Sequence, residues 1–414
     1  MMEPDYYKDF RCIGDLCRNN CCSADWDIHV DKKTYKKYKN LPKNHPMYKT
    51  ILKNIVLLEG NNDFRYAKYR QTENKSDSNK RCVFQDEQGL CVIHANLGEE
   101  YLSNTCKHYP RSLNYCIRKE EELSFFESAC NISCEEVANL FLKKEDYIEY
   151  ELSEENYGKN YVEEHLKSRV TNFLREEERS IIGLYPNIKS IIIAILQDRN
   201  YNFEDRLVLL AIFCQKLNDL EKNFNEETVL NYINEFVYSV ENGLFNSILQ
   251  NDIKNEISYA FSAIIINIIL KINDCDNEIL NRVINNISKL QDTELKEYSE
   301  GDFAKNSKKV LKEKATFLEH IFVNEASIRM IPFYKKYDIF ENAQLLIVIY
   351  SLYRLMLSLY IGDQTEISDE EIADLTAYFG KILLHTNMTN EIIIDTLKTI
   401  KLDNLSSLIV LIKG

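Results

Sequence analysis

Four cysteines within eleven positions make the start of the chain its most reactive segment. They are Cys12, Cys17, Cys21 and Cys22, in the stretch FRCIGDLCRNNCCSADW. Thiolates are the metal-binding form of cysteine, and several of them in a partly buried site repel one another unless a cation offsets their charge. The grouping therefore predicts a metal centre, with reduced structural thiols or disulfides as the alternative.

Further cysteines follow up to residue 134, and only Cys214 and Cys275 lie beyond it. Soft thiolate donors select zinc, copper(I) or iron-sulfur clusters over magnesium and calcium. The spacing does not choose among them, because the thiols suffice for two tetrahedral zinc ions, whereas one [4Fe-4S] cluster would leave several spare. The cysteines of this second group are Cys82, Cys91, Cys106, Cys116, Cys130 and Cys134.

Histidine and tryptophan side chains accompany the cysteines. His29, His94 and His108 lie in the same part of the chain. Imidazole can replace a thiolate as a ligand, but we interpret each histidine as a surface residue or as a hydrogen-bond partner of a ligand. Trp26 is the only tryptophan. It is expected to cover the cysteine turn as an apolar lid, with stacking on a substrate as the alternative.

The balance of charge argues against nucleic-acid binding. The chain of 414 residues has 51 basic and 65 acidic side chains, a formal net charge of -14, which excludes a generic polyanion binder. Residues 1–140 carry 21 of each sign and no basic stripe, so a nucleic-acid-binding zinc module is disfavoured.

The sequence favours the cytoplasm. Its first residues, MMEPDYYKDF, lack a basic segment followed by an apolar one. In a reducing cytosol, clustered thiols are more often metal ligands than disulfides. The longest apolar stretch, Ala343 to Ile361, contains Gln344 and Arg354, and we interpret it as a buried helix rather than a membrane span. We therefore expect no membrane contact.

The elements that must hold these side chains are expected to be mainly helical. Only 11 glycines and 6 prolines are available for turns. Apolar residues recur at intervals of three and four beyond residue 150, which predicts amphipathic helices. Two such sets are Leu166, Val170, Phe173 and Leu174, and then Leu207, Leu210, Phe213 and Leu217. Further helices are predicted at about 228–240, 255–273, 277–291, 307–323, 341–361, 368–385 and 390–412.

The distribution of cysteine predicts two domains in a mainly α protein. Residues 1–145 are expected to form an irregular cysteine-rich metal-binding module, and residues 146–414 an all-helical, bundle-like domain. Within the first, RCVFQDEQGLCVIH predicts two short extended pieces around a turn at Gln88 and Gly89. No fixed repeat period is found.

The motifs resemble the flagellin lysine-N-methylase family, within the cysteine-cluster proteins described as zinc- or iron-chelating. The resemblance covers residues 1–142, and the segments that carry it are CIGDLCRNNCCSADWDIHVDKKTYKKYKN, RCVFQDEQGLCVIH, NLGEEYLSNTCKHYPR and SCEEVANLFL. It implies a methylase that uses S-adenosylmethionine and acts on lysine side chains of flagellin. Val137 stands where the family pattern has alanine.

The resemblance also implies a set of ligands. The family's cysteines correspond to Cys12, Cys17, Cys21, Cys22, Cys82, Cys91, Cys106 and Cys134, whereas Cys116 and Cys130 fall outside the pattern. The resemblance favours an iron-sulfur cluster, [4Fe-4S], with zinc as the alternative.

The sequence does not locate the methyl-transfer chemistry. No GxGxxG loop follows a strand, so a Rossmann-type cofactor site is not visible. No CxxxCxxC motif is present either, because Ala24 stands at its third position after Cys17 and Cys21. Polar transfer and cluster-assisted transfer therefore both stay open, and so do the catalytic residues and the oligomeric state. The alternative function is that of a non-enzymatic metal or iron-sulfur binding interaction protein.

Overall fold

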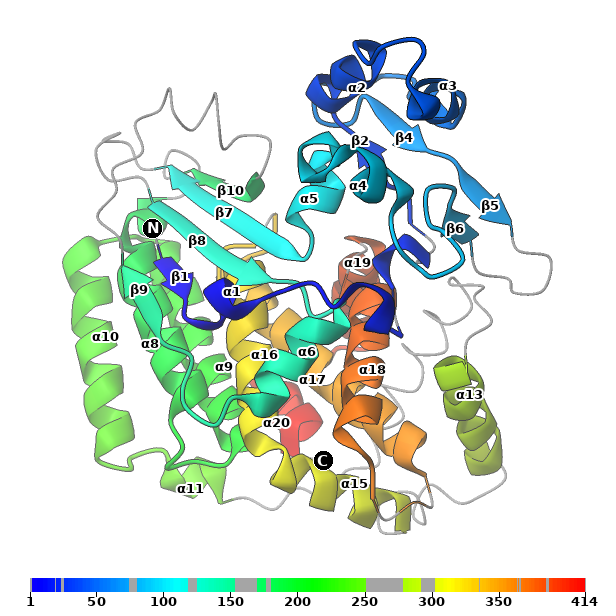
Figure 1. The fold of residues 1–414 in the computed structure, drawn as a ribbon. Coiled ribbons are helices and arrows are strands. Elements are labelled where there is room, and N and C mark those ends of the chain that lie inside the picture. The colour runs from blue at the N-terminus through cyan, green and yellow to red at the C-terminus, as the bar shows by residue number, and fades with distance from the viewer. Residues whose placement is uncertain are drawn as a thin grey trace.

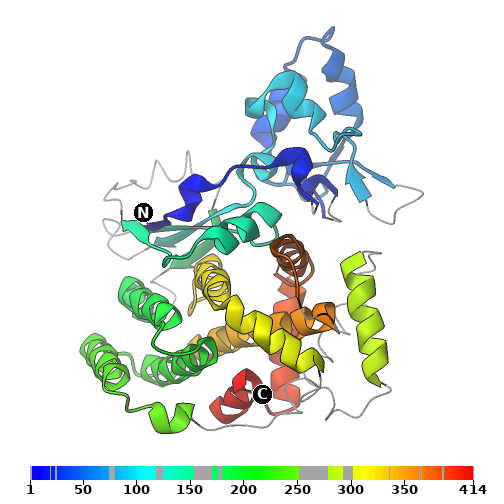
Figure 2. The ribbon, with the colours of Figure 1, turned by 60° about the horizontal axis from the view of Figure 1, so that its bottom comes forward.

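The architecture was obtained as a computed structural model, shown as a ribbon in Figures 1 and 2. The residues that it describes are 2–18, 20–23, 26–73, 80–117, 125–152, 170–175, 180–250, 278–291, 302–334, 336–362, 364, 366–384 and 387–413. The helix predicted at 255–273 and Cys275 lie outside these ranges. Most of the described chain is helical, as the scarcity of glycine and proline predicts.

A small module with its own core projects from the rest of the molecule, at the upper right of Figure 1. The side chains of Tyr38 and Tyr69 meet at its centre, with their hydroxyl oxygens 2.6 Å apart. Helix α2 begins after Asp31, whose side chain accepts a hydrogen bond from the Thr34 N–H, as a good N-cap does. The elements of the module are β2 (His29–Val30), α2 (Lys32–Lys39), α3 (Pro46–Lys53), β3 (Ile55–Leu57), β4 (Ala67–Tyr69), β5 (Gln71–Glu73), β6 (Lys80–Cys82), α4 (Val92–Leu97) and α5 (Asn104–His108).

The hairpin predicted in the second cysteine segment is partly confirmed. Gln85 and Cys91 form an antiparallel bridge around the turn at Gly89, whose φ of 85° suits glycine. The residues from Val92 onward were expected to be extended, but they form helix α4. The reason is that Cys91 begins a helical turn as soon as the bridge ends.

One sheet of the described chain takes its strands from both predicted domains, residues 1–145 and 146–414. Among the described residues, five strands pair in the order β10-β7-β8-β1-β9, with β7 and β8 antiparallel and β1 antiparallel to β9. The two latest strands in the chain therefore lie at the two edges of a sheet whose middle comes from the first 130 residues. These strands are β1 (Met2–Pro4), β7 (Arg111–Ile117), β8 (Phe125–Cys130), β9 (Tyr150–Leu152) and β10 (Val170–Arg175).

This sheet corrects two predictions. The region expected to be all-helical from residue 146 begins with two strands, β9 and β10. The apolar residues Val170, Phe173 and Leu174 belong to a strand parallel to β7, and not to a helix face. A segment of six residues is too short for its hydrophobic periodicity to distinguish a helix from a strand. Here the segment forms a strand because the open edge of β7 supplies partners for its backbone hydrogen bonds. Among the described residues beyond 146, the first helical element is a 3-10 turn (Ser180–Leu184).

The helices pack around one central helix, α17 (Ile339–Ile361), in which only Glu341 is not buried. Asp338 and Glu341 form a capping box at its start. Leu207, Leu210, Phe213 and Leu217 are fully buried on the neighbouring helix α9, which confirms that prediction. The surrounding helices are α6 (Glu135–Lys143), α8 (Tyr185–Gln197), α9 (Phe203–Glu221), α10 (Glu226–Glu241), α13 (Glu278–Gln291), α15 (Asp302–Glu313), α16 (Ala315–Ile328), α18 (Asp369–Phe379), α19 (Asn387–Thr399) and α20 (Leu405–Lys413).

Two described helical segments are long and apolar enough to cross a membrane, Ser180–Gln197 and Ile339–Ile361. The second is wholly enclosed by the other helices, as expected of a core helix, and half of the first is buried.

Buried charges fix the sheet and the helices together. Lys189 on α8 lies 3.0 Å from Glu127 on β8, and neither side chain is more than 1% exposed. Tyr185 donates a hydrogen bond to the same carboxylate. A second buried carboxylate, Glu319 on α16, is paired with Arg206 at 2.7 Å and with Arg199 at 2.9 Å.

Glu319→Gln should lower the free energy of unfolding by about 3 kcal/mol, because it leaves the guanidinium of Arg206 buried without a counter-charge. Urea unfolding followed by circular dichroism measures the change. The matched control is Glu313→Gln on α15, where the ion pair with Lys309 is long and exposed and the expected loss is below about 0.5 kcal/mol. Equal losses in the two variants would contradict the prediction.

Candidate functional site

The eight cysteines predicted as ligands gather at the junction between the small module, the start of α6 and the end of α18. The N-terminal segment passes between the module and α18, as Figure 1 shows in dark blue. Two short 3-10 turns in it, Gly14–Leu16 and Cys21–Ser23, hold the first thiols. The module adds Cys82, Cys91 and Cys106, and Cys134 is the residue before helix α6.

Cys21 is the centre of this group. Its thiol accepts a hydrogen bond from Cys22, which together with the charge of Lys381 lowers the pKa of Cys21 to about 7, against the opposing effect of burial. The same hydrogen bond, with burial, raises the pKa of Cys22. The two adjacent thiols thus shift each other's pKa in opposite directions, and the structure does not join them as a disulfide.

The three thiols of the module face this pair. Burial raises the pKa of Cys82 to about 11 and that of Cys106 to about 12, and the charge of Cys21 adds to both effects. Burial also raises the pKa of Cys91, and the charge of Cys21 adds to that rise, but the N–H groups of the first turn of α4 oppose it. These five sulfur atoms therefore lie close enough to affect one another's ionisation.

The other three cysteines lie on the N-terminal segment, at Cys12 and Cys17, and directly before helix α6, at Cys134. Burial raises the pKa of Cys134 to about 12, and the charges of Cys21 and Cys12 add to it. Cys17 donates to the carboxylate of Glu135 over 3.5 Å, and the N–H of Arg18 donates to the same oxygen over 2.8 Å. All eight predicted ligands thus belong to one electrostatically connected group, which we call the cysteine cluster.

The donor set of the cysteine cluster suits a soft metal. Most of its cysteines are half-buried, with Cys82 buried and Cys12 exposed, and several thiols hinder one another's ionisation, so an added positive charge would favour the thiolate forms. Within the described ranges, no three His, Cys, Asp or Glu side chains have the arrangement that holds a metal ion. The cluster brings the donors together without placing them at ligand distances, and their role as ligands stays a prediction.

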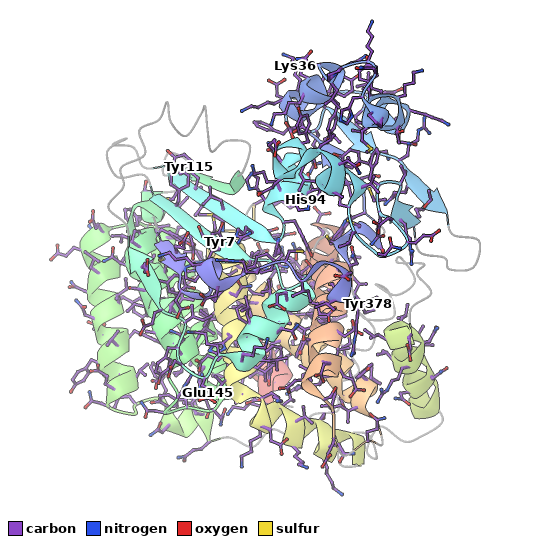
Figure 3. The ribbon with its side chains drawn as sticks, in the orientation of Figure 1. Tyr7, Lys36, His94, Tyr115, Glu145 and Tyr378 are labelled. Atoms are coloured by element: carbon purple, nitrogen blue, oxygen red, sulfur yellow. The ribbon has the colours of Figure 1, made fainter. Side chains whose placement is uncertain are left out.

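His94 and His29 differ in their relation to the cluster. His94 lies on the small module, as labelled in Figure 3; its side chain is exposed, and its backbone N–H lowers the pKa of Cys91. His29 is paired in strand β2, where burial and the charge of Arg65 lower its pKa. A role of either side chain as a ligand stays a prediction.

Trp26 occupies the position expected of a lid. Its indole N–H donates to the backbone oxygen of Cys21 over 3.1 Å, and its ring meets Tyr109 edge-on at 5.5 Å. It packs on the core that contains Cys22, Cys82 and Cys106. The structure thus favours the covering role over substrate stacking.

The cysteines outside the family pattern are packing residues. Cys116 on β7 and Cys130 on β8 are fully buried in the larger core, and Cys214 is fully buried on α9. Small apolar side chains fill such positions well, so no ligand role is needed to explain them.

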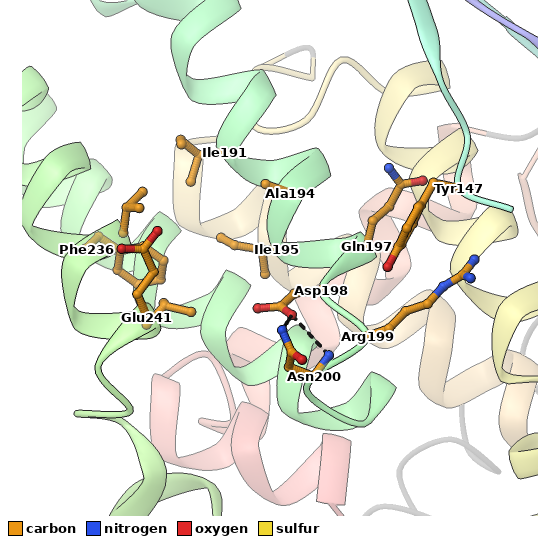
Figure 4. Close-up of a pocket in the computed structure, with 12 residues that line it drawn as sticks. Tyr147, Ile191, Ala194, Ile195, Gln197, Asp198, Arg199, Asn200, Phe236 and Glu241 are labelled. Atoms are coloured by element: carbon orange, nitrogen blue, oxygen red, sulfur yellow. Dashed lines mark hydrogen bonds between the residues drawn. The ribbon is translucent and has the colours of Figure 1, made fainter.

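A separate pocket of about 410 Å³ lies between α8 and α10 (Figure 4). Its apolar floor is formed by residues of both helices, including Ile195 and Phe236. Asp198 and Glu241 supply carboxylates, and the ring of Tyr147 lies under the guanidinium of Arg199, 4.1 Å from its centroid. An apolar floor with carboxylates at its edge suits a ligand that has an apolar body and a positive charge.

Hydrogen bonds hold the walls of this pocket. Gln197 accepts from the N–H of Ile148 over 2.9 Å, and Asp198 accepts from the N–H of Asn200 over 3.1 Å. The hydroxyl of Tyr201 donates to the backbone oxygen of Val240 over 3.0 Å and so ties the end of α10 to the loop after α8. The pocket is therefore pre-formed on three elements.

A model of one protein family matches the helical part of the chain. It is described as the FliB lysine N-methylase C-terminal domain, and it matches residues 189–411. The chain belongs to the FliB lysine N-methylase family. This confirms the resemblance seen in the cysteine motifs, and it does so from a different part of the sequence.

Curated relatives in this family come from Salmonella. The chain is 28% identical over 144 residues to lysine-N-methylases of Salmonella choleraesuis and Salmonella typhimurium, over 35% of this chain and 33% of each relative. It is 31% identical over 145 residues to the flagellar biosynthetic protein FliU of Salmonella muenchen, over 35% of this chain and 78% of that protein. The match thus spans about a third of the two lysine-N-methylases. No solved structure matches the chain.

Two residues of the cluster region were missed by the sequence analysis. Glu135 follows Cys134 in the SCEE segment, where its type alone does not show that it turns back to Cys17. Lys381 lies 247 positions beyond Cys134 (381 minus 134), in the FliB domain, and no local pattern connects it to the cysteines. Both contacts depend on long-range packing.

In reduced, metal-free protein, the alkylation rate of Cys21 should be half-maximal near pH 7 and should fall below that pH, because the thiolate is the nucleophile and its pKa is lowered. Cys22→Ala removes the hydrogen-bond donor and should move this midpoint upward, toward about 8.5. Mass spectrometry of iodoacetamide-treated peptides measures both rates. An unchanged midpoint in the variant would contradict the assigned cause.

Proposed function

We propose that this protein is a protein-lysine N-methyltransferase that acts on flagellin with S-adenosylmethionine as the methyl donor. The observation that carries the proposal is the match of residues 189–411 to the FliB lysine N-methylase domain. The names of the Salmonella relatives, lysine-N-methylase and flagellar biosynthetic protein, support lysine as the target and flagellin as the protein that carries it.

The reaction would be a simple displacement at carbon. The lone pair of the lysine nitrogen forms the new N–C bond while the C–S bond of the sulfonium breaks, and S-adenosylhomocysteine leaves as a neutral thioether. The nitrogen then loses a proton to a base or to solvent. A free lysine has a pKa of about 10.4, so deprotonating it at pH 7 costs about 4.6 kcal/mol, which desolvation or a nearby carboxylate must offset.

The pocket between α8 and α10 supports this choice of methyl donor. S-adenosylmethionine combines an apolar purine and chain with a sulfonium and an ammonium group, and Asp198 and Glu241 offer the opposite charge. Within the part of the chain that the structure describes, the side chain of Glu241 makes no hydrogen bond or ion pair. Its carboxylate is therefore available to a ligand.

The cysteine cluster would hold the family's metal centre. We infer an iron-sulfur cluster, [4Fe-4S], with zinc as the competing outcome, held by cysteines drawn from the eight. An iron-sulfur cluster would supply one-electron chemistry, whereas zinc would stabilise the junction between the small module and the helices. The protein's own contribution is to exclude water with Trp26 and to gather thiols of mixed pKa.

The proposed setting is the cytoplasm, where flagellin is made. The net charge of -14 disfavours nucleic acid as a partner and favours a lysine-bearing protein surface. Membrane association is not part of the proposal.

Purified protein incubated with methyl-labelled S-adenosylmethionine and flagellin should transfer label to flagellin lysines, because the chain would supply both the donor site and the means to deprotonate lysine. Scintillation counting and peptide mass spectrometry measure the transfer. Glu241→Gln should raise the KM for S-adenosylmethionine with little change in kcat, since it removes a charge that binds the ground state and transition state alike.

The control for this experiment is Glu235→Gln, on an exposed position of α10 outside the pocket lining. No label on flagellin with metal-replete protein would refute the methylase proposal. If label is transferred but Glu241→Gln leaves the KM for S-adenosylmethionine unchanged, the methylase proposal stands and only the assignment of S-adenosylmethionine to this pocket is contradicted.

Anaerobically purified protein should contain metal, and Cys22→Ala should lose most of it, because Cys22 interacts electrostatically with both Cys82 and Cys106. Elemental analysis with an assay for acid-labile sulfide measures the content and separates iron-sulfur from zinc. Cys116→Ala is the matched control, since it removes a buried thiol outside the cluster. Retained stoichiometry in Cys22→Ala would remove that residue from the ligands.

A further inference from the structure

The FliB domain touches the backbone of the cysteine cluster at one glycine. A side chain at Gly380 would place its Cβ atom 2.6 Å from the backbone nitrogen and 2.8 Å from the Cα atom of Ser133, and 3.0 Å from the carbonyl carbon of Ile132. Backbone atoms cannot move aside as a flexible side chain can. The helical domain therefore lies directly against the residue that precedes Cys134.

The next residue, Lys381, interacts electrostatically with thiols of the cluster. Its ammonium group interacts electrostatically with the thiols of Cys17, Cys21 and Cys134, and more weakly with Asp374. Cys17 and Cys21 belong to the N-terminal segment and Cys134 directly precedes helix α6, so one cation interacts with thiols from two separate parts of the chain. Burial lowers the pKa of Lys381, and these thiols oppose that shift.

A local irregularity positions this lysine. Helix α18 does not end at Phe379 but continues as a π-helical turn, Gly380–Leu384. A π turn has wider residue spacing than an α-helix and is often found at functional sites. Here it begins at the glycine that touches Ser133, so the altered spacing and the close approach occur together.

The positive charge of Lys381 has the sign that stabilises a metal bound by thiolates. A zinc ion with four thiolates, or a [4Fe-4S] cluster with four thiolates, retains excess negative charge in a partly buried space. A fixed ammonium group nearby stabilises that charge, as hydrogen-bonding and charged groups around metal ligands do in general. The opposite charge at position 381 would add to the repulsion.

We propose that Lys381 is the charge-compensating residue of the cysteine cluster, through which the FliB domain sets how tightly the N-terminal thiols hold their metal. It is a positioning residue that acts through the thiolates. The proposal rests on the metal centre proposed above, and it adds that the metal site is incomplete without the C-terminal domain.

The test compares Lys381→Met, which keeps the length of the side chain without its charge, with Lys381→Arg, which keeps the charge. Full-length proteins are purified anaerobically, and the loss of metal to EDTA is followed by elemental analysis. Lys381→Met should lose metal about 10- to 100-fold faster than wild type, and Lys381→Arg should stay close to wild type. Lys312→Met, at an exposed position of α15, is the matched control and should not change.

A second readout separates charge from structure. If the metal is iron, a redox titration followed by visible absorbance should place the midpoint potential of Lys381→Met below that of wild type, because the reduced cluster carries more negative charge. Lys381→Arg should restore it. A purely structural role would change the thermal unfolding midpoint of both variants and leave the potential of the folded fraction unchanged.

The outcomes distinguish the two proposals. Wild-type protein without metal would overturn both the metal centre and the role of Lys381. Metal-containing wild-type protein whose rate of metal loss is the same in Lys381→Met would overturn the role of Lys381 alone. If Lys381→Met does not fold, Lys381→Gln takes its place under the same criteria, and loss of metal in Lys381→Arg equal to that in the neutral variant would also overturn the proposal.

Discussion

Mutual repulsion of buried negative charge is the constraint on which the junction of this protein depends. Eight thiols gathered in one partly buried region cannot ionise together, and the pKa of several is raised by burial and by one another. Two effects oppose this repulsion: the interaction with Cys22 lowers the pKa of Cys21, and the charge of Lys381 interacts favourably with the thiols of Cys17, Cys21 and Cys134. A bound cation would be the third.

Buried charges of opposite sign are also paired elsewhere in the fold. The sheet is built from strands of both halves of the chain, and Glu127 on its central strand β8 is neutralised by Lys189 at the start of α8. Glu319 does the same for two arginines between α8, α9 and α16. Burying one partner of such a pair without the other costs free energy, so each pair favours one arrangement of the sheet against the helices. The positions of Cys134 and Lys381 depend on that arrangement.

The sequence predicted what depends on local pattern and missed what depends on distant contacts. The spacing of Cys12, Cys17, Cys21 and Cys22 is a local pattern that predicts a common metal partner, and that partner stays a prediction. The central helix could be predicted from residues 343 to 361, since a largely apolar stretch this long is too long for a typical strand. By contrast, Leu174 lies on a strand only because that strand can pair with the open edge of β7. The six residues of β10 contain no sign of this distant partner.

Lys381 shows this limit most clearly, and it also shows why the two halves must be considered together. By sequence it is one of many lysines on helices, and the role proposed for it rests on the close approach of Gly380 to Ser133 and on its interaction with the thiols. The cysteine motifs and the match to the FliB domain come from different parts of the chain, residues 1–142 and 189–411, yet both point to one family. The physical link between them is this contact, because it places a cation of one part among the thiols of the other. A thiol cluster whose compensating charge comes from the neighbouring domain can be complete only when both domains are folded and docked, so metal binding would report on the assembly of the whole chain.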